Sequence, residues 1–268
     1  MLLDVRRHVP LGVPLDRAAV VVPVPEHVGT AFTPRQLTLR GLPVFELNQW
    51  CGTCPALFQK LTDPEAADLR LADRRLGVGL DGIDDDVLRV YGQVLPESAY
   101  TVLLLEVTPS LVHPGSRCDY FSHEQVATWG VDPGAGSPGN PGTPYYRTFE
   151  TSVDADRHLY EFVVPMVPPS WNDGDRVAAY SVDDGNHPTV VAYSLLDLVQ
   201  PAMNEGSDYY EHWVLSHFLL DGHHKIEAAA SAGRAVRLLC LVDEDISLAG
   251  AEDVTTMTRA RSSASRSR

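Results

Sequence analysis

The stretch from His217 to Ala230 constrains the fold of this 268-residue chain more than any other segment. An apolar run is followed at once by Asp221 and Gly222, then by two histidines, a lysine and an alanine-rich segment. The apolar run is typical of a buried strand, and the alanines favour a helix that ends at Gly233. Because residues 235–242 are again strand-like, the segment predicts a strand, a tight turn, a helix and a second strand, which together form a compact α/β unit.

The turn at residues 221–225, which reads Asp-Gly-His-His-Lys, has the chemistry of an anion-binding site. The first turn of a helix carries unpaired N–H groups and the positive end of the helix dipole, so phosphate oxygens are favoured there. Gly222 permits a sharp turn and close backbone approach. Lys225 is one of only two lysines, the other being Lys60, in a chain that otherwise uses arginine. The same residues also fit a plain helix start that is capped by Asp221.

The charge and composition of the chain favour a small anionic ligand over nucleic acid. The formal charge is -15, and the last ten residues contribute four arginines without any acid, so the rest of the chain is more acidic still. An acidic body argues against a nucleic-acid partner. The first ten residues lack the apolar segment of a signal peptide, and no apolar run reaches membrane-spanning length. We therefore expect a cytoplasmic protein with no membrane partner.

Hydrophobic periodicity predicts a mixture of strands and helices, and therefore an α/β protein that is α+β overall. Strands are expected at residues 18–24, 42–47, 100–107, 157–167, 176–182, 189–196, 213–220 and 235–242. Helices are expected at residues 56–61, 64–75 and 222–233. The acids at 84–86 are expected to cap one more short helix rather than hold a metal. The Gly- and Pro-rich residues 131–144 predict an irregular loop.

The turn resembles the signature of the ParB/sulfiredoxin-like fold superfamily, in which a strand, a Gly-containing basic turn and a helix hold nucleotide phosphates. The variant that it resembles most is the Asp-Gly-His-His-Arg form of free serine kinases. The segment Ser194–Pro201 also resembles the opening strand and loop of this module. The resemblance covers about residues 189–243, which is under a quarter of the chain.

The resemblance implies a nucleotide, ATP or ADP with Mg²⁺, bound at the start of the helix. His223, His224 and Lys225 would contact phosphate oxygens, with the backbone of Gly222 close against them. Lys225 stands where arginine is usual, so it offers a point charge rather than a planar fork. The turn contains no cysteine and no helix-turn-helix region follows it, which disfavours sulfiredoxin chemistry and DNA partition.

The resemblance also implies phosphoryl transfer to a small hydroxylated metabolite. His223 would stabilise charge on the transferred group, and Asp221 would orient a histidine or help to hold the divalent cation. A carboxylate would deprotonate the acceptor hydroxyl. Glu205, in the loop after the strand at 189–196, is the candidate for that general base.

The sequence Cys51-Gly52-Thr53-Cys54 has two possible chemistries besides that of ordinary core cysteines. A structural Zn²⁺ site would need two further ligands, which Cys118 and His123, or His113 and Cys118, would supply. A thioredoxin-like thiol site would need a helix N-terminus to lower the pKa of the first thiol.

Two other residues are expected in the core. His217 lies on the same strand face as Leu215 and Leu219, which predicts that it is buried near the turn. Cys240 lies within an apolar strand and is expected to be a core residue.

These observations predict an N-terminal mixed α+β region with the Cys-x-x-Cys at 1–150, a ParB/sulfiredoxin-like nucleotide-binding unit at 151–250 and a disordered Ser/Arg tail at 251–268. The leading hypothesis is a nucleotide-dependent phosphotransferase. One alternative is a non-catalytic, zinc-stabilised regulatory protein that binds a nucleotide or another anion. Another is a thiol oxidoreductase that uses Cys51 and Cys54.

Overall fold

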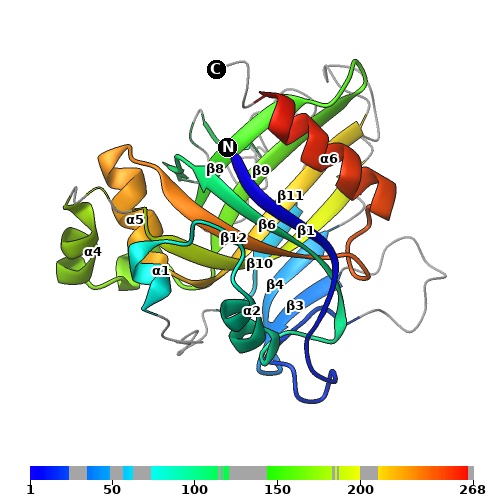
Figure 1. Cartoon of the computed structure of the whole chain (residues 1–268), viewed down its shortest axis with the longest axis horizontal. Helices are drawn as coiled ribbons and strands as arrows, with labels where there is room; N and C mark the ends of the chain where they lie inside the picture. Colours follow the sequence, from blue (N-terminus) through cyan, green and yellow to red (C-terminus); the bar gives the residue numbers. More distant parts are fainter. Residues whose placement is uncertain are drawn as a thin grey trace, which may run out of the picture.

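A mixed eight-stranded sheet organises the fold (Figure 1). Its strands lie in the order β1 (Leu2–Leu11), β6 (Ser98–Val107), β12 (Val236–Asp243), β10 (Thr189–Val199), β11 (Glu211–Asp221), β9 (Arg157–Pro165), β8 (Tyr145–Ser152) and β7 (Ser110–Val112). The structure is a computed structural model that describes residues 1–23, 35–48, 57–62, 74–113, 116, 118–120, 144–182, 185, 187–199 and 211–264. Within this described part of the chain, no helix is long and apolar enough to cross a membrane.

The connection between β6 and β7 requires this sheet to curl back on itself. Strand β6 lies next to one edge of the sheet and β7 forms the other edge, yet only Thr108 and Pro109 separate them. Three steps of about 3.8 Å between consecutive Cα atoms keep Val107 within about 11 Å of Ser110. Helix α5 (His223–Ala232) accordingly contacts β7 as well as β10 and β12. We call the face of the sheet on which α5 packs the inner face and the opposite face the outer face.

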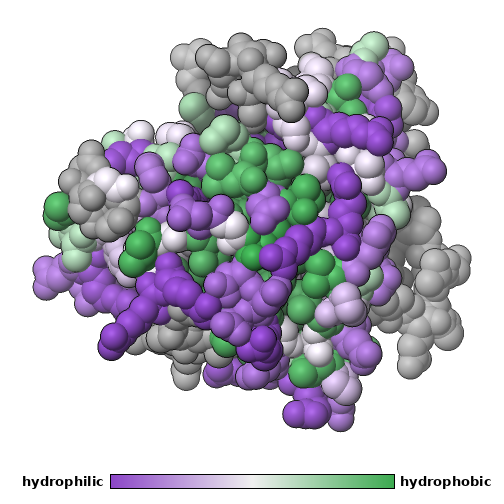
Figure 2. Space-filling view, viewed as in Figure 1, coloured by the Kyte–Doolittle hydropathy of each residue, from purple (hydrophilic) through white to green (hydrophobic). Residues whose placement is uncertain are grey.

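The inner face carries an apolar core that α5 and α6 (Ala251–Ala264) cover. Alternate strand residues, such as Leu103, Ala192 and Leu215, point into this core because side chains along a strand alternate between the two faces. The helices contribute Ile226 and Val254 to the same buried cluster. Figure 2 shows apolar side chains gathered over the strands that lie between α5 and α6, with hydrophilic side chains around them.

The outer face is covered by a second sheet and by α2 (Asp85–Gly92). The second sheet has the order β2 (Val20–Val21), β3 (Arg35–Leu39), β4 (Leu42–Asn48) and β5 (Leu57–Lys60). Aromatic rings join the two sheets: Phe45 lies 5.4 Å from Phe218, and Phe58 stacks on Phe162 at 5.7 Å, both measured between ring centroids. Such ring pairs add to the stabilisation that comes from apolar burial alone.

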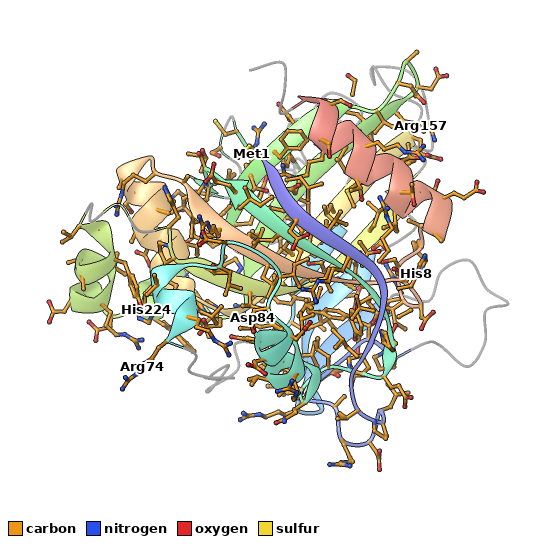
Figure 3. The ribbon with its side chains drawn as sticks, viewed as in Figure 1. Met1, His8, Arg74, Asp84, Arg157 and His224 are labelled. Carbon is orange, nitrogen blue, oxygen red and sulfur yellow. The ribbon has the colours of Figure 1, made fainter. Side chains whose placement is uncertain are left out.

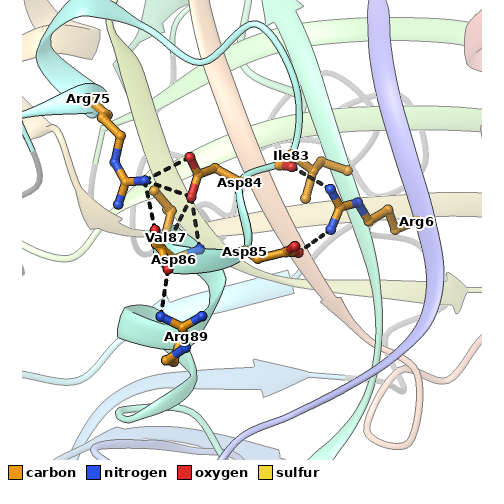
Figure 4. A network of polar contacts seen from close by, with 8 residues as sticks. All are labelled: Arg6, Arg75, Ile83, Asp84, Asp85, Asp86, Val87 and Arg89. Atoms are coloured by element: carbon orange, nitrogen blue, oxygen red, sulfur yellow. Dashed lines mark hydrogen bonds and ion pairs between the residues drawn. The ribbon is translucent and has the colours of Figure 1, made fainter.

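The acids at 84–86 cap a helix, as predicted (Figure 4). The Asp84 carboxylate accepts a hydrogen bond from the backbone N–H of Asp86 at 2.8 Å, so it satisfies a donor of the first turn of α2. Arg75 of α1 (Arg75–Val78) pairs with Asp84 at 2.8 Å. Arg6 of β1 pairs with Asp85. The acids therefore tie three elements together.

Most of the predicted strands are confirmed, and both predicted regions contribute to one sheet. The expected strands at 42–47, 100–107, 157–167, 189–196, 213–220 and 235–242 correspond to β4, β6, β9, β10, β11 and β12. The strand expected at 18–24 is reduced to β2. The eight-stranded sheet takes β1, β6, β7 and β8 from the first 152 residues and its other strands from the rest of the chain.

Three local predictions are wrong. The helix expected at 56–61 is strand β5, because these residues pair with β4. The strand expected at 176–182 is helix α4 (Gly174–Ser181), whose first turn is capped by the side chain of Asp173. The disordered tail expected from residue 251 is helix α6 up to Ala264, because its apolar residues pack on the inner face. The helix expected at 64–75 lies almost entirely, and the loop expected at 131–144 all but its last residue, outside the described residues.

A row of buried polar side chains crosses the inner face beneath α6. The Ser194 hydroxyl lies 2.8 Å from Nδ1 of His217, and the Cys240 sulfur lies 4.0 Å from Nε2 of the same ring. Arg261 of α6 bonds the Glu161 carboxylate through Nε at 2.6 Å and through Nη2 at 3.0 Å. All five residues are buried, which confirms the predicted burial of His217 and Cys240.

Burial and the charge of Arg261 together decide the protonation states in this row. Desolvation lowers the pKa of His217 to about 4, because the neighbouring Glu161 carboxylate offsets only part of the cost of a buried imidazolium. Burial alone would raise the pKa of Glu161, but the charge of Arg261 and the hydrogen bonds to the carboxylate lower it overall. Burial raises the pKa of the Cys240 thiol. Near neutral pH the row therefore holds a neutral imidazole, a neutral thiol and one ion pair.

We expect the free energy of unfolding to fall as the pH decreases from about 6.5 to 4. The unfolded histidine takes up a proton near pH 6.5, whereas folded His217 stays neutral down to about 4. The unfolded state therefore binds more protons in this window. The accumulated loss in the free energy of unfolding is about 3 kcal/mol at the acid end of the window. A His217→Asn variant keeps a hydrogen-bond partner for Ser194 but cannot titrate. Urea unfolding between pH 4 and 7 should show a slope about one proton smaller for this variant, and equal slopes would contradict the assignment.

Candidate functional site

The strand-to-helix turn is formed as the sequence predicts. Strand β11 ends at Asp221, and α5 begins at His223 directly after Gly222. Gly222 has φ of +96°, a left-handed conformation that residues with a side chain rarely adopt. A Cβ atom at this position would lie 2.6 Å from Cγ1 of Val190, which leaves no room for a side chain. Both the backbone conformation and the close packing on β10 therefore require glycine here.

The end of α5 is also formed as predicted. Gly233 has φ of +61° and follows the last helical residue, Ala232. Its backbone N–H points to the carbonyl groups of Ala229 and Ala230, which are among those that a helix end leaves unpaired. Left-handed glycines therefore bound α5 on both sides.

The charge of Lys225 is directed beneath the helix. Its side chain is only 8% exposed, and Nζ donates to the Thr189 carbonyl oxygen at 3.0 Å and to the Asp221 carboxylate at 3.2 Å. A compact ammonium on a long flexible stem can satisfy both acceptors from within the first turn. These two contacts explain the unusual lysine in structural terms, because the ion pair fastens the start of α5 to the end of β11 and the hydrogen bond fastens it to the start of β10. Asp221 therefore has Lys225 as its charged partner.

A segment some fifty residues earlier in the chain packs on the first turn of α5 (Figure 3). The backbone N–H of Asp173 donates to Nε2 of His224 at 3.1 Å. Since Nε2 accepts a hydrogen bond, the neutral ring of His224 carries its proton on Nδ1. The side-chain amide of Asn172 donates to the Glu227 carboxylate and lies 3.5 Å from the His223 carbonyl oxygen. The start of α4 is thereby fixed beside the start of α5.

Thr189 connects the turn to the segment after α1. Its hydroxyl oxygen accepts a hydrogen bond from the Leu80 N–H at 2.9 Å, and its carbonyl oxygen accepts the bond from Lys225. Arg237, at the start of β12, bonds the Leu80 carbonyl oxygen and the Asp81 carboxylate, each at 2.7 Å. Leu80 and Asp81, which follow α1, therefore lie next to the starts of β10 and β12, and Thr189 links them to Lys225 of the turn.

The structure brings part of the predicted site together and leaves the rest untested. The predicted phosphate-binding residues lie together at the start of α5 because they are consecutive in the sequence. They are Gly222, His223, His224 and Lys225, with Asp221 before them. The remaining predicted residues lie outside the described residues: Glu205, Cys51, Cys54 and His123. Cys118 is described, and it is an exposed free cysteine. The described residues contain no group of three or more His, Cys, Asp or Glu side chains that could hold a metal ion.

Sequence reasoning missed the contribution of Asn172, Asp173 and Glu227. Glu227 follows His223 by four residues, a spacing that places two side chains on the same face of a helix, so this position could have been found. Residues 172–174, Asn-Asp-Gly, lie between the strands expected at 157–167 and 176–182, although an Asp before a helix is a common N-cap. The contact of this cap with His224 is long-range and has no signal in the local sequence.

No family model, curated protein or solved structure matches this chain. The likeness of residues 189–243 to the ParB/sulfiredoxin-like superfamily therefore stays a prediction from the motif.

We expect Gly222→Ala to destabilise the protein by about 3 kcal/mol, because it adds a left-handed alanine to a steric overlap with Val190. Gly233→Ala is the matched control. The backbone of Gly233 also has a positive φ, +61°, but a Cβ atom added there would meet no atom within 4 Å. The control variant should lose about 1 kcal/mol of unfolding free energy, which is the cost of a left-handed alanine alone. Urea unfolding measures both losses, and equal values would contradict the close packing at Gly222.

Proposed function

We propose that the chain is a nucleotide-dependent phosphotransferase that holds phosphate at the start of α5 and acts on a small hydroxylated metabolite. One observation carries the proposal. The left-handed Gly222 lets α5 begin directly at the end of β11, so the N–H groups of the first turn and two histidines share one short turn. This is the arrangement that favours phosphate at a helix start. The proposal includes a ParB/sulfiredoxin-like unit over residues 189–243.

In this proposal the ion pair between Asp221 and Lys225 rearranges when the nucleotide binds. Nζ of Lys225 and the Asp221 carboxylate neutralise each other at 3.2 Å. A Mg²⁺–nucleotide would offer each of them a stronger partner, phosphate oxygens for the ammonium and the cation for the carboxylate. Mg²⁺ would neutralise the phosphate charge that develops during transfer. His223 and His224 would bind the phosphate oxygens from the first turn.

The acceptor hydroxyl needs a general base, and two carboxylates are candidates. Glu205 is proposed from its place in the loop after the strand expected at 189–196, and it lies outside the described residues. Glu227 lies one helical turn after His223, and its carboxylate is oriented by the Asn172 amide. An oriented carboxylate next to the phosphate site is well suited to accept a proton in phosphoryl transfer.

We expect ATP or ADP with Mg²⁺ to raise the melting temperature of the protein, because a ligand that binds only the folded state stabilises it. His223→Ala should weaken nucleotide binding about tenfold or more, as expected for the loss of a hydrogen bond to a charged group. His8→Ala is the control, because His8 is exposed and distant from His224 in Figure 3. Calorimetry measures the affinities. No binding of either nucleotide would overturn the proposal.

Catalysis is tested separately from binding. Glu205→Gln and Glu227→Gln should leave nucleotide affinity within about twofold, and the variant that removes the general base should lower kcat about a hundredfold or more. A coupled assay for nucleotide consumption with a panel of hydroxylated metabolites measures this effect. If both variants retain full turnover, neither carboxylate is the base.

The second candidate function is a non-catalytic regulatory protein, stabilised by Zn²⁺, that binds a nucleotide or another anion. The observation that favours it is the buried position of the Lys225 ammonium, whose charge is already neutralised by Asp221. Nucleotide binding without turnover would support this candidate. Metal analysis tests its zinc site, because stoichiometric zinc should be lost in Cys51→Ser. A thiol oxidoreductase based on Cys51 and Cys54 would instead show dithiol–disulfide cycling.

A further inference from the structure

Helix α6 has little intrinsic stability of its own. Hydroxyl groups at Thr255, Thr256, Thr258 and Ser262 donate to the carbonyl group four residues earlier, at 2.8 to 3.0 Å. Such bonds compete with the helical ladder and weaken or bend a helix. Thr and Ser are also poorer helix formers than the alanines of α5. The stability of α6 therefore depends on its docking to the sheet.

The docking surface of α6 is one narrow face. Val254, Met257, Thr258 and Arg261 are buried, and their spacing places them on a single stripe of the helix. Arg261 forms the charged contact at one end of this stripe, with two hydrogen bonds to Glu161. The stripe is anchored by the ion pair because two apolar side chains bury little area by themselves.

The surroundings of the Arg261 guanidinium have the features of a cation site. The Glu161 carboxylate receives both guanidinium bonds and a third bond from the Thr148 hydroxyl at 2.8 Å. The Phe149 ring lies 4.5 Å from the guanidinium carbon, measured to its centroid. A bidentate carboxylate together with an aromatic face recognises a guanidinium through geometry as well as charge.

The polar row beneath α6 continues from this site into the core. Ser194, His217 and Cys240 are buried beside Glu161, and the Glu161 and Arg261 charges act on both His217 and Cys240. Apolar side chains would be the more stable choice at such positions, because buried polar groups and ion pairs seldom add net stability. Elements that open are drawn from the least stable parts of a fold, so a weakly stable helix over a row of polar side chains is suited to open.

We propose that α6 is a lid, latched by the Glu161–Arg261 pair, and that it opens over a cation site on the inner face of the sheet. When Arg261 withdraws, the Glu161 carboxylate keeps the Thr148 hydroxyl and the Phe149 ring beside it. The open site would accept the guanidinium or ammonium group of a small ligand. This inference is independent of the function proposed for the turn at 221–225.

The buried Cys240 thiol reports lid opening directly. The full-length protein is treated with a maleimide at increasing urea, and modification of the peptide that contains Cys240 is followed by mass spectrometry. A lid predicts labelling that hardly depends on urea below the unfolding transition, because a local opening exposes little surface. If Cys240 labelling follows global unfolding at every urea concentration, the lid does not exist.

The latch is tested with two matched variants. Arg261→Met removes the buried charge, whereas Arg259→Met makes the same change at an exposed residue of α6 that forms no ion pair with a described residue. Cys240 labelling should become at least tenfold faster in Arg261→Met and should change less than twofold in Arg259→Met. Equal rates in the two variants would refute the latch, and the wild-type measurement decides the question if Arg261→Met fails to fold.

The cation site is tested by chemical rescue. Arg261→Ala leaves space at the Glu161 carboxylate, and millimolar methylguanidinium should slow Cys240 labelling back toward the wild-type rate by at least fivefold. The double variant Glu161→Gln/Arg261→Ala lacks the charge and should not respond, and neither should Arg261→Ala treated with urea at the same concentration. Protection of both variants, or of neither, would refute a guanidinium site at Glu161.

Discussion

The two-residue connection between β6 and β7 is the constraint on which the rest of this structure depends. It joins a strand beside one edge of the large sheet to the strand at the opposite edge, so the sheet must curl. The curl allows α5 to contact strands that would be far apart in a flat sheet. Polar groups such as Glu161 and His217 are held out of water on the inner face, beneath α6.

The candidate site takes its form from this packing rather than from its own residues alone. Gly222 is required because Val190 leaves no space for a side chain, and Lys225 holds the same strand end from below. The residues that make the turn attractive for phosphate are thus also the residues that fasten α5 to β10. Structural and functional demands on the turn coincide, so stability measurements and ligand measurements are both needed to separate them.

The sequence allowed good prediction where the determinants are local. The apolar run before Asp221, the alanines after it and Gly233 specify β11 and α5 through periodicity and backbone preference. Helix α4 was missed because Asp173 caps it within a segment that also fits a turn, and α6 was missed because its Ser and Arg composition is typical of disorder. Within the site, the histidines could be predicted, whereas the contact of Asp173 with His224 depends on the tertiary fold.

The position of α6 in the chain has a consequence for what the large sheet needs in order to be stable. Every strand of the large sheet precedes α6, so a chain shortened before residue 251 would keep all eight strands and lose the helix that packs on its inner face. Such a chain would also lose Arg261 and leave the Glu161 carboxylate without its counter-ion in a partly desolvated position. Helix α6 therefore neutralises the sheet as well as covering it.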